Sequence, residues 1–267
     1  MLIEFFGLPG SGKSTMSRLV ADLLLKRGLA VEEITYDLDH KRPRVERLLV
    51  KISHLLQYAA THPRYVLSGL AQVVATRQRS LLDLGKSVFN WMFIASIASR
   101  TQSSHTITLL DQGVAQALWS IRFAARQQNS LELLLAEAER APLRPDLIIC
   151  VRANFQTIGD RLAARARRVS RLDALGQDYK ALQRAETHAS AIMRKLRFSG
   201  IPVIEVENND RKQLHSGARL VAGSILTALT GQGSAVGGRP RYGKPPLARL
   251  AESSARDDQS IEGQSPP

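Results

Sequence analysis

The hydrophobic positions of the chain follow two alternating patterns, short apolar runs and longer stretches with helical spacing. Five apolar runs predict β-strands, at residues 2–6, 30–35, 105–111, 146–151 and 201–207. Helical spacing predicts helices at 14–27, 44–100, 113–140, 155–198 and 211–229, with breaks at 61–64 and near 83–86. Strands that alternate with helices form right-handed βαβ units, and a run as apolar as LIICV is typical of a parallel strand buried on both faces. The pattern therefore predicts an α/β fold on a five-stranded parallel sheet.

The end of the chain has a different composition. Residues 231–267 are rich in Gly, Pro, Ser and charged residues and show little apolar periodicity. A segment of this kind cannot bury enough apolar surface to offset the entropy of ordering it. We therefore expect one domain over residues 1–230, followed by a disordered tail over 231–267.

The positive charge of the chain favours anionic partners but does not indicate which kind. A net charge of +13 and a pI of about 10.4 favour nucleotides, nucleic acid or an anionic membrane. Arginine-rich helix surfaces with no such partner explain the charge equally well.

Cysteine usage and the apolar runs bear on the compartment. The one cysteine, Cys150, lies in an apolar run, so we expect a buried strand residue, no internal disulfide and a cytoplasmic location. The N-terminus lacks the basic region and cleavage site of a signal peptide. The longest apolar run, 88–98, is well short of the ~20 residues that span a bilayer. We expect a core helix there, with a membrane-surface helix as the alternative, and no transmembrane segment.

A phosphate-binding loop follows the first predicted strand. Residues 7–14, GLPGSGKS, fit the pattern G-x-x-x-x-G-K-[ST], in which glycines bring backbone N–H groups against phosphate oxygens. In this pattern Lys13 reaches the β and γ phosphates, the Ser14 hydroxyl ligates Mg²⁺, and the following helix directs its positive dipole end at the anion. The alternative is a glycine turn with no ligand. The predicted nucleotide-binding residues are Gly7, Pro9, Gly10, Ser11, Gly12, Lys13, Ser14 and Thr15.

The form GLPGSGKST resembles the loop of P-loop nucleotide and small-molecule kinases, the group that includes thymidylate kinase, deoxynucleoside kinases, adenylate kinase and shikimate kinase. Over about residues 1–230, the resemblance implies a three-layer α/β/α fold with sheet order 2-3-1-4-5. It also implies a helical insertion, an Arg-rich lid, and phosphoryl transfer from ATP with Mg²⁺ to a small acceptor.

Asp111 ends the third predicted strand, in the run TITLLD. A carboxylate at this edge of the sheet can hold Mg²⁺ through water, so we predict that Ser14 and Asp111 form the metal site. A plain strand-end cap is the alternative. The next residue, Gln112, is neither the Glu of many P-loop motors nor the Arg usual in nucleoside and thymidylate kinases. The guanine-reading pattern N-K-x-D is absent from the sequence, which favours ATP.

Arginines crowd the segment after the fourth predicted strand. On a helix Arg161, Arg165 and Arg168 share one face, and Arg167 and Arg171 form a neighbouring i, i+4 pair. Guanidinium groups neutralise the charge of a transferring phosphoryl group. The segment resembles the thymidylate kinase lid, which implies a lid over 155–175 with Arg161, Arg165, Arg167 and Arg171 on phosphates. A basic solvated helix or a nucleic-acid patch is the alternative.

The acceptor side is less specific. Asp37 and Asp39 lie just past the second predicted strand, where a carboxylate can take the proton of an attacking hydroxyl, and Asp-x-Asp here resembles shikimate and related metabolite kinases. In an extended segment the two point to opposite sides, and turn or salt-bridge roles stay open. The insertion at 41–104 mixes arginines with aromatic residues, which suits an anionic or aromatic acceptor. Asn208 follows the fifth predicted strand, where related kinases contact adenine.

The leading hypothesis is a kinase that transfers phosphate from ATP·Mg²⁺ to a small molecule, a nucleoside or nucleoside monophosphate before others. Three alternatives stay open: an ATP-binding regulatory protein without transfer, a shikimate-kinase-like metabolite kinase, and a polynucleotide kinase, with nucleic acid not favoured as a partner. The sequence also leaves a homodimer open.

Overall fold

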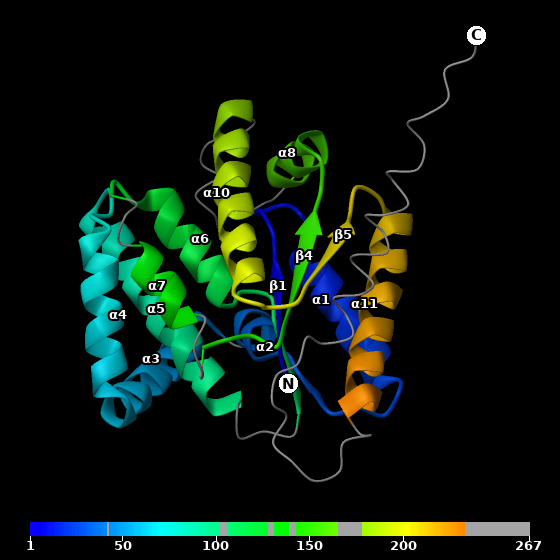
Figure 1. Cartoon of the computed structure of the whole chain (residues 1–267), viewed down its shortest axis with the longest axis horizontal. Helices are drawn as coiled ribbons and strands as arrows, with labels where there is room; N and C mark the ends of the chain where they lie inside the picture. Colours follow the sequence, from blue (N-terminus) through cyan, green and yellow to red (C-terminus); the bar gives the residue numbers. More distant parts are fainter. Residues whose placement is uncertain (42, 102–105, 128–130, 139–142, 165–177, 233–267) are drawn as a thin grey trace.

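The computed structural model describes residues 1–232, apart from residues 42, 102–105, 128–130, 139–142 and 165–177 (Figure 1). The predicted tail therefore lies outside the described residues, except for its first two positions. These belong to the last helix, α11, which spans Arg211–Gln232 and ends beyond the predicted boundary at residue 230.

Five parallel strands form the sheet, in the order β2-β3-β1-β4-β5. Their bounds are Leu2–Phe6 for β1, Val31–Glu32 for β2, Ile107–Leu110 for β3, Leu147–Arg152 for β4 and Val203–Glu207 for β5. Ile3 of β1 is in register with Leu109 on one side and Leu147 on the other. The predicted sheet and its order are confirmed.

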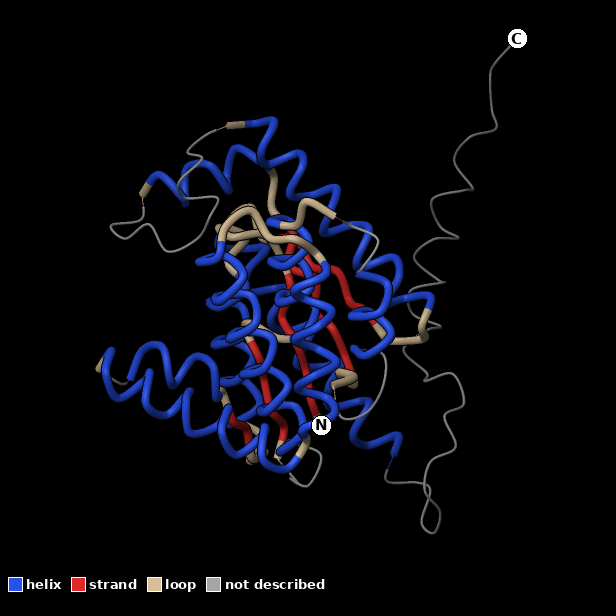
Figure 2. The backbone as a smooth tube through the Cα atoms, turned by 90° about the vertical axis from the view of Figure 1, so that its left-hand side faces the viewer, coloured by secondary structure: helices blue, strands red, loops and turns tan. Residues whose placement is uncertain are grey.

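Helices cover both faces of the sheet. On one face α1, Lys13–Leu25, packs against α11, and on the other lie α6, Val114–Ala124, and α10, Tyr179–Phe198 (Figure 1). Alternate strand residues enter different core layers: Ile3 and Phe5 join the α1–α11 side, while Leu2 and Phe6 join the other. Figure 2, seen from the side of α4, shows helices lying over the strands. The three-layer prediction is therefore confirmed.

The described part of the insertion between β2 and β3 contains four helices, α2 at Ile34–Lys41, α3 at Arg44–Thr61, α4 at Pro63–Ala75 and α5 at Leu81–Thr101. The break predicted near 83–86 is wrong, because α5 already begins at Leu81. Ser80 explains the earlier start: its hydroxyl accepts from the backbone N–H of Asp83 at 3.1 Å, as an N-cap side chain does, and donates to the Asp83 carboxylate at 2.9 Å.

The second predicted strand is also shorter than expected. β2 has two residues instead of the predicted 30–35, and the chain turns into α2 at Ile34. The carboxylate of Glu33 is held by Arg18 and by the Ser17 hydroxyl, and the Glu33 carbonyl oxygen accepts from the backbone N–H of Asp37 at 2.9 Å. Asp37 and Asp39 consequently lie in a helix and not in the extended segment predicted for them.

Two long predicted helices are divided. The predicted helix 113–140 consists of α6 and α7, Leu131–Ala138, because backbone N–H groups of Arg126 and Gln127 bond to the link between α4 and α5. The predicted helix 155–198 is divided as well: α8 spans Phe155–Ala163, and α10 begins after Asp178. The Asp178 carboxylate accepts hydrogen bonds from two backbone N–H groups in the first turn of α10.

Judged by length and composition alone, α5 could cross a membrane, since its most apolar 18 residues have a mean hydropathy of 1.2. Here α5 packs against α3, α4 and α6, and Trp91, Phe93 and Ile97 are buried in the core. The prediction of a core helix at 88–98 is confirmed.

Candidate phosphate-binding site

The loop between β1 and α1 has the backbone shape that the glycine pattern predicts. Gly10 and Gly12 adopt positive φ angles of 91° and 87°, which residues with a Cβ rarely adopt. A Cβ on Gly7 would stand 2.4 Å from the carbonyl oxygen of Val151, so the loop passes close over the end of β4. Gly7, Pro9 and Gly10 are buried, and Thr15 is exposed at the first turn of α1.

The N-terminus of α1 is open to an anion. Gly12 occupies the N-cap position, no side chain of the described residues caps it, and the first turn carries no acidic residue. The N–H groups of a helix's first turn have no partner within the helix and carry partial positive charge. Half-buried Lys13 begins this helix. The arrangement is that of an anion site at a helix N-terminus.

Asn208 and Arg161 support the loop. Asn208, 2% exposed, donates its side-chain N–H to the carbonyl oxygen of Ser11 at 2.7 Å. The Arg161 guanidinium donates to the carbonyl oxygens of Gly10 and Ser11, both at 3.3 Å, and partial burial lowers the pKa of this arginine. These bonds turn the loop carbonyls toward the protein.

Ser14 and Asp111 meet as the sequence predicts. The Ser14 hydroxyl donates to Asp111 Oδ2 at 2.8 Å, joining the start of α1 to the end of β3. The backbone N–H of Asp111 donates to the Thr35 hydroxyl at 3.3 Å. Asp111 is 4% exposed, and its Oδ1 has no hydrogen-bond partner in the described part of the chain. A buried carboxylate oxygen without a partner, next to a serine hydroxyl, suits a hard cation such as Mg²⁺.

A second buried carboxylate fixes the segment after Asp111. Glu4, 1% exposed in the middle of β1, accepts the backbone N–H groups of Ala115 and Gln116 at 3.0 and 2.9 Å. It thus caps α6, and Gly113 has no room for a Cβ, which would stand 2.4 Å from this side chain. Burial raises the pKa of Glu4 to about 7, against the lowering effect of these backbone bonds.

Asp37 lies in α2 and lines a cavity of about 310 Å³ together with Arg18, Glu33 and the side of α1 that carries Ala21 and Leu25. No residue of the phosphate loop is among the described residues that line this cavity. The side chain of Asp39 and the whole of Arg165, Arg167 and Arg171 lie outside the described residues, and α8 ends at Ala163, before these arginines.

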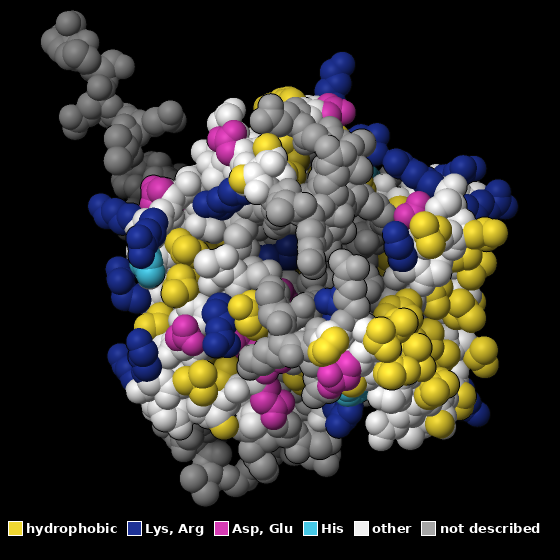
Figure 3. Space-filling model, turned by 180° about the vertical axis from the view of Figure 1, so that it is seen from behind, with side chains coloured by type: hydrophobic (Ala, Val, Ile, Leu, Met, Phe, Trp, Pro, Cys, Tyr) yellow, Lys and Arg dark blue, Asp and Glu magenta, His cyan; other side chains and the backbone are white. Residues whose placement is uncertain are grey.

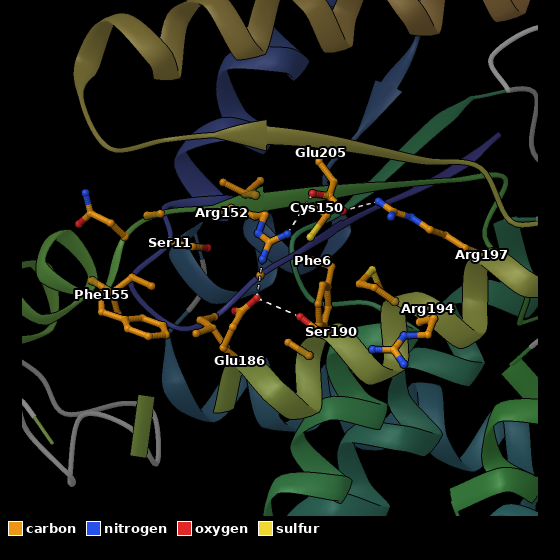
Figure 4. A pocket seen from close by; sticks show the side chains of 18 of the residues that line it. Phe6, Ser11, Cys150, Arg152, Phe155, Glu186, Ser190, Arg194, Arg197 and Glu205 are labelled. Atoms are coloured by element: carbon orange, nitrogen blue, oxygen red, sulfur yellow. Dashed lines mark hydrogen bonds and ion pairs between the residues drawn. The ribbon is translucent and has the colours of Figure 1, made fainter. Parts of the chain in front are cut away.

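A larger cavity, of about 970 Å³, lies between the end of β4, β5, α8 and α10 (Figure 4). Gly7, Leu8 and Ser11 form part of its wall, whereas Lys13, Ser14 and Asp111 are not among the described residues that line it. An ion-pair chain crosses it: Arg152 contacts Glu186 at 2.9 Å and Glu205 at 3.1 Å, and Arg197 also pairs with Glu205. The cavity thus borders the phosphate loop without including its cationic residues.

Several residues of the site were not assigned these roles from the sequence. The sequence does contain a signal for Glu4, because a lone carboxylate inside the apolar run LIEFF requires a hydrogen-bond partner when it is buried. The sequence carries no signal for the role of Thr35 or for the ion pairs of Arg152, because these contacts join segments that are distant in the sequence. Asn208 was predicted beside adenine; the structure shows its side chain under the loop.

No family model matches the chain, and no curated protein matches it.

Among solved structures, deoxyadenosine kinases from M. mycoides are similar. The structure with products dCMP and a flexible dCDP bound is 14% identical with a TM-score of 0.48, covering 85% of this chain and 99% of that one. The dCTP-bound and dATP-bound structures are 14% and 15% identical, with TM-scores of 0.48 and 0.49, and cover 85% of this chain and 100% of theirs. The fold follows from the strand order β2-β3-β1-β4-β5 and from the shape of the loop after β1.

Proposed function

We propose that this protein is an ATP-dependent kinase that transfers the γ-phosphoryl group of ATP to a small acceptor, a nucleoside or nucleoside monophosphate. The observation that carries the proposal is the Ser14–Asp111 hydrogen bond of 2.8 Å beside the uncapped N-terminus of α1. A hydroxyl, a carboxylate oxygen that has no hydrogen-bond partner among the described residues, and the first turn of α1, which no described side chain caps, meet at one edge of the sheet. This combination suits a nucleoside triphosphate with its metal ion better than a bare anion.

The proposed roles follow the chemistry of each group. The loop N–H groups and Lys13 bind the phosphates and stabilise negative charge on the γ-phosphoryl oxygens. Ser14 and Asp111 would hold Mg²⁺, which would neutralise negative charge on the phosphates when bound. Arg161 positions the loop through its carbonyl oxygens. Arg165, Arg167 and Arg171 are proposed as phosphate contacts on the sequence pattern alone.

On the acceptor side, Asp37 and Asp39 are the candidates for orienting an attacking hydroxyl. Asp37 lines the cavity beside α1. A nucleoside monophosphate would need no strong base. The preference for a nucleobase in the acceptor comes from the resemblance of the loop and the arginine-rich segment to nucleotide kinases.

A second candidate function is ATP binding without transfer to a small acceptor. Gln112, directly after Asp111, is exposed at the position where related kinases carry Arg. A protein that uses nucleotide occupancy as a signal would keep the loop and the Ser14–Asp111 pair and would not need that cation. A kinase of another metabolite, as in the shikimate kinase group, fits the same loop.

The test is ADP release from ATP·Mg²⁺ with pooled acceptors, with Lys13→Ala as the blank. Separate pools contain nucleosides, nucleoside monophosphates, hydroxylated acids and sugars, and short oligonucleotides. We expect stimulation by the nucleoside or monophosphate pool, lost in Lys13→Ala. Stimulation by another pool would show that the acceptor belongs to that class of compound instead. ATP binding with no stimulation by any pool would favour the regulatory function.

A further inference from the structure

The helical insertion exposes an unusual amount of apolar side chain. Eleven of the fifteen large hydrophobic side chains exposed in the described residues lie between positions 45 and 82. They are Val45, Leu48, Leu49, Ile52, Leu56, Tyr65, Leu67, Leu70, Val74, Leu81 and Leu82. Figure 3 shows hydrophobic side chains gathered on the side of the molecule where α3 and α4 lie. A monomeric soluble domain rarely leaves such a concentration without a partner.

These side chains form stripes along the two helices. On α3 the residues Val45, Leu48, Leu49, Ile52 and Leu56 follow helical spacing and lie within about 100° of arc. On α4, Leu67, Leu70 and Val74 repeat at i, i+3 and i+7. We call these eight residues the insertion face.

The insertion face is not the side by which the helices join the domain. Tyr58 of α3 and Val73 of α4, 5% and 0% exposed, belong to the core that also contains Trp91 of α5. Each helix therefore has one buried apolar side and a second apolar side in solvent. A second apolar side is not needed for folding.

The charge of the chain segment that carries the insertion face favours some of the surfaces that could cover it over others. Residues 45–82 contain five cationic side chains and one carboxylate, a net charge of +4. Arg64, Arg77 and Arg79 among them are exposed. A second copy of the chain would bring like charge against like charge. The tail offers little cover, because residues 233–267 hold only five large apolar residues in 35.

We propose that α3 and α4 dock this protein onto an anionic lipid bilayer. The insertion face enters the boundary between headgroups and acyl chains, and the surrounding arginines contact lipid phosphates. Apolar stripes flanked by cationic residues bind membranes by this combination of burial and electrostatic attraction. The docking is independent of phosphoryl transfer.

The test is co-sedimentation of the full chain with vesicles. Vesicles of equal phosphatidylcholine and phosphatidylglycerol are compared with pure phosphatidylcholine, at low and high salt. We expect binding to the anionic vesicles that falls about tenfold in pure phosphatidylcholine and weakens with salt, because anionic headgroups supply the attraction and salt screens it.

Two pairs of variants separate the parts of the proposal. Leu49→Asp/Leu56→Asp places charge on the insertion face, where the two leucines are 61% and 67% exposed. Leu25→Asp/Leu220→Asp, at 48% and 56% exposed positions of α1 and α11, is the matched control. Arg64→Glu/Arg77→Glu reverses two exposed charges, at the start of α4 and just after its end, and Arg27→Glu/Arg219→Glu gives the same change in net charge elsewhere. We expect each insertion variant to lose about tenfold in vesicle binding and each control to lose little.

The proposal fails if the wild-type protein does not bind anionic vesicles, or if the leucine variant binds them as the wild type does. Light scattering supplies another outcome that would overturn it. A dimer that Leu49→Asp/Leu56→Asp dissociates, without vesicle binding by the wild type, would make the insertion face an interface between copies. Thermal unfolding of every variant shows whether a loss of binding reflects loss of fold; if the leucine variant unfolds, the arginine pair decides.

Discussion

The side chain of Asn208 holds the backbone of Ser11, 197 positions away in the sequence, by a buried hydrogen bond of 2.7 Å. This contact links the end of β5 to the middle of the phosphate loop. Arg161 adds two bonds to carbonyl oxygens of the same loop from α8. The loop is therefore held in one shape before any phosphate arrives, which lowers the entropy cost of binding.

Asn208→Ala should weaken nucleotide binding as well as stability. The carbonyl oxygen of Ser11 loses a buried donor, at a cost of about 1–3 kcal/mol in unfolding free energy. We expect ATP affinity, measured by calorimetry, to fall about tenfold as the loop loses preorganisation. Asn90→Ala, at an exposed position of α5, is the control. Wild-type affinity in Asn208→Ala would show that the contact does not organise the site.

Gly12→Ala should cost far more than another glycine substitution at positive φ. At Gly12 a Cβ would stand 2.2 Å from Asn208 Nδ2, whereas at Gly28, with φ 77°, it would meet nothing within 4 Å. Gly28→Ala thus measures backbone strain alone, on the order of 1 kcal/mol. We expect a greater loss of unfolding free energy and of ATP binding in Gly12→Ala. Equal urea midpoints for the two variants would contradict the close packing of Asn208.

Asp111→Asn tests the metal site. The amide keeps the size of the side chain and removes the charge that would attract Mg²⁺. We expect the gain in ATP affinity on adding Mg²⁺ to fall by about tenfold or more, since a charged ligand is lost, with ATP binding in EDTA unchanged. Asp160→Asn, at an exposed position of α8, is the matched control. An unchanged Mg²⁺ effect in Asp111→Asn would remove Asp111 from the metal site.

The sequence predicts the parts of this molecule that local chemistry determines. The loop at residues 7–14 and the strand β1 need only a glycine pattern and an apolar run, and both are where they were predicted. The pairing of Ser14 with Asp111 follows from the parallel sheet, because carboxyl ends of neighbouring strands share an edge.

Features that depend on distant contacts could not be predicted in this way. The apolar run at 30–35 reads as a strand, yet Glu33 is drawn to Arg18 and Ser17 of α1 and the chain turns into α2. Asp37 therefore lies in α2 and not in the extended segment predicted for it. The support of the loop by Asn208 likewise depends on β5 lying next to β4, which periodicity does not show.

Cys150 should resist thiol reagents in the native protein. Burial raises the pKa of this thiol to about 12 from its ordinary 9.0, and the side chain is 7% exposed in β4. At pH 8 about one molecule in ten thousand would carry the reactive thiolate. We expect slow reaction with a disulfide reagent in native buffer and complete, fast reaction in denaturant. Fast stoichiometric reaction of the folded protein would show that β4 is open to solvent.

Glu4 gives the protein a pH dependence of known sign. Its folded pKa of about 7 lies above the ordinary value of 4.5, so the folded protein binds one more proton than the unfolded chain between these values. The contribution of Glu4 to stability is therefore fully present below about pH 4.5 and is lost as the pH rises through about 7. The full change is about 3 kcal/mol.

Glu4→Gln removes this titration and keeps an oxygen to accept the N–H groups of Ala115 and Gln116. We expect the unfolding free energy from urea titrations to fall between pH 5 and pH 7.5 in the wild type, and to fall by less in Glu4→Gln. Glu207→Gln, at an exposed position of β5, should follow the wild type. The same slope in Glu4→Gln and the wild type would mean that the carboxylate is charged in the folded protein throughout this range. The N-terminus of α6 would then be stabilising that charge more strongly than burial disfavours it.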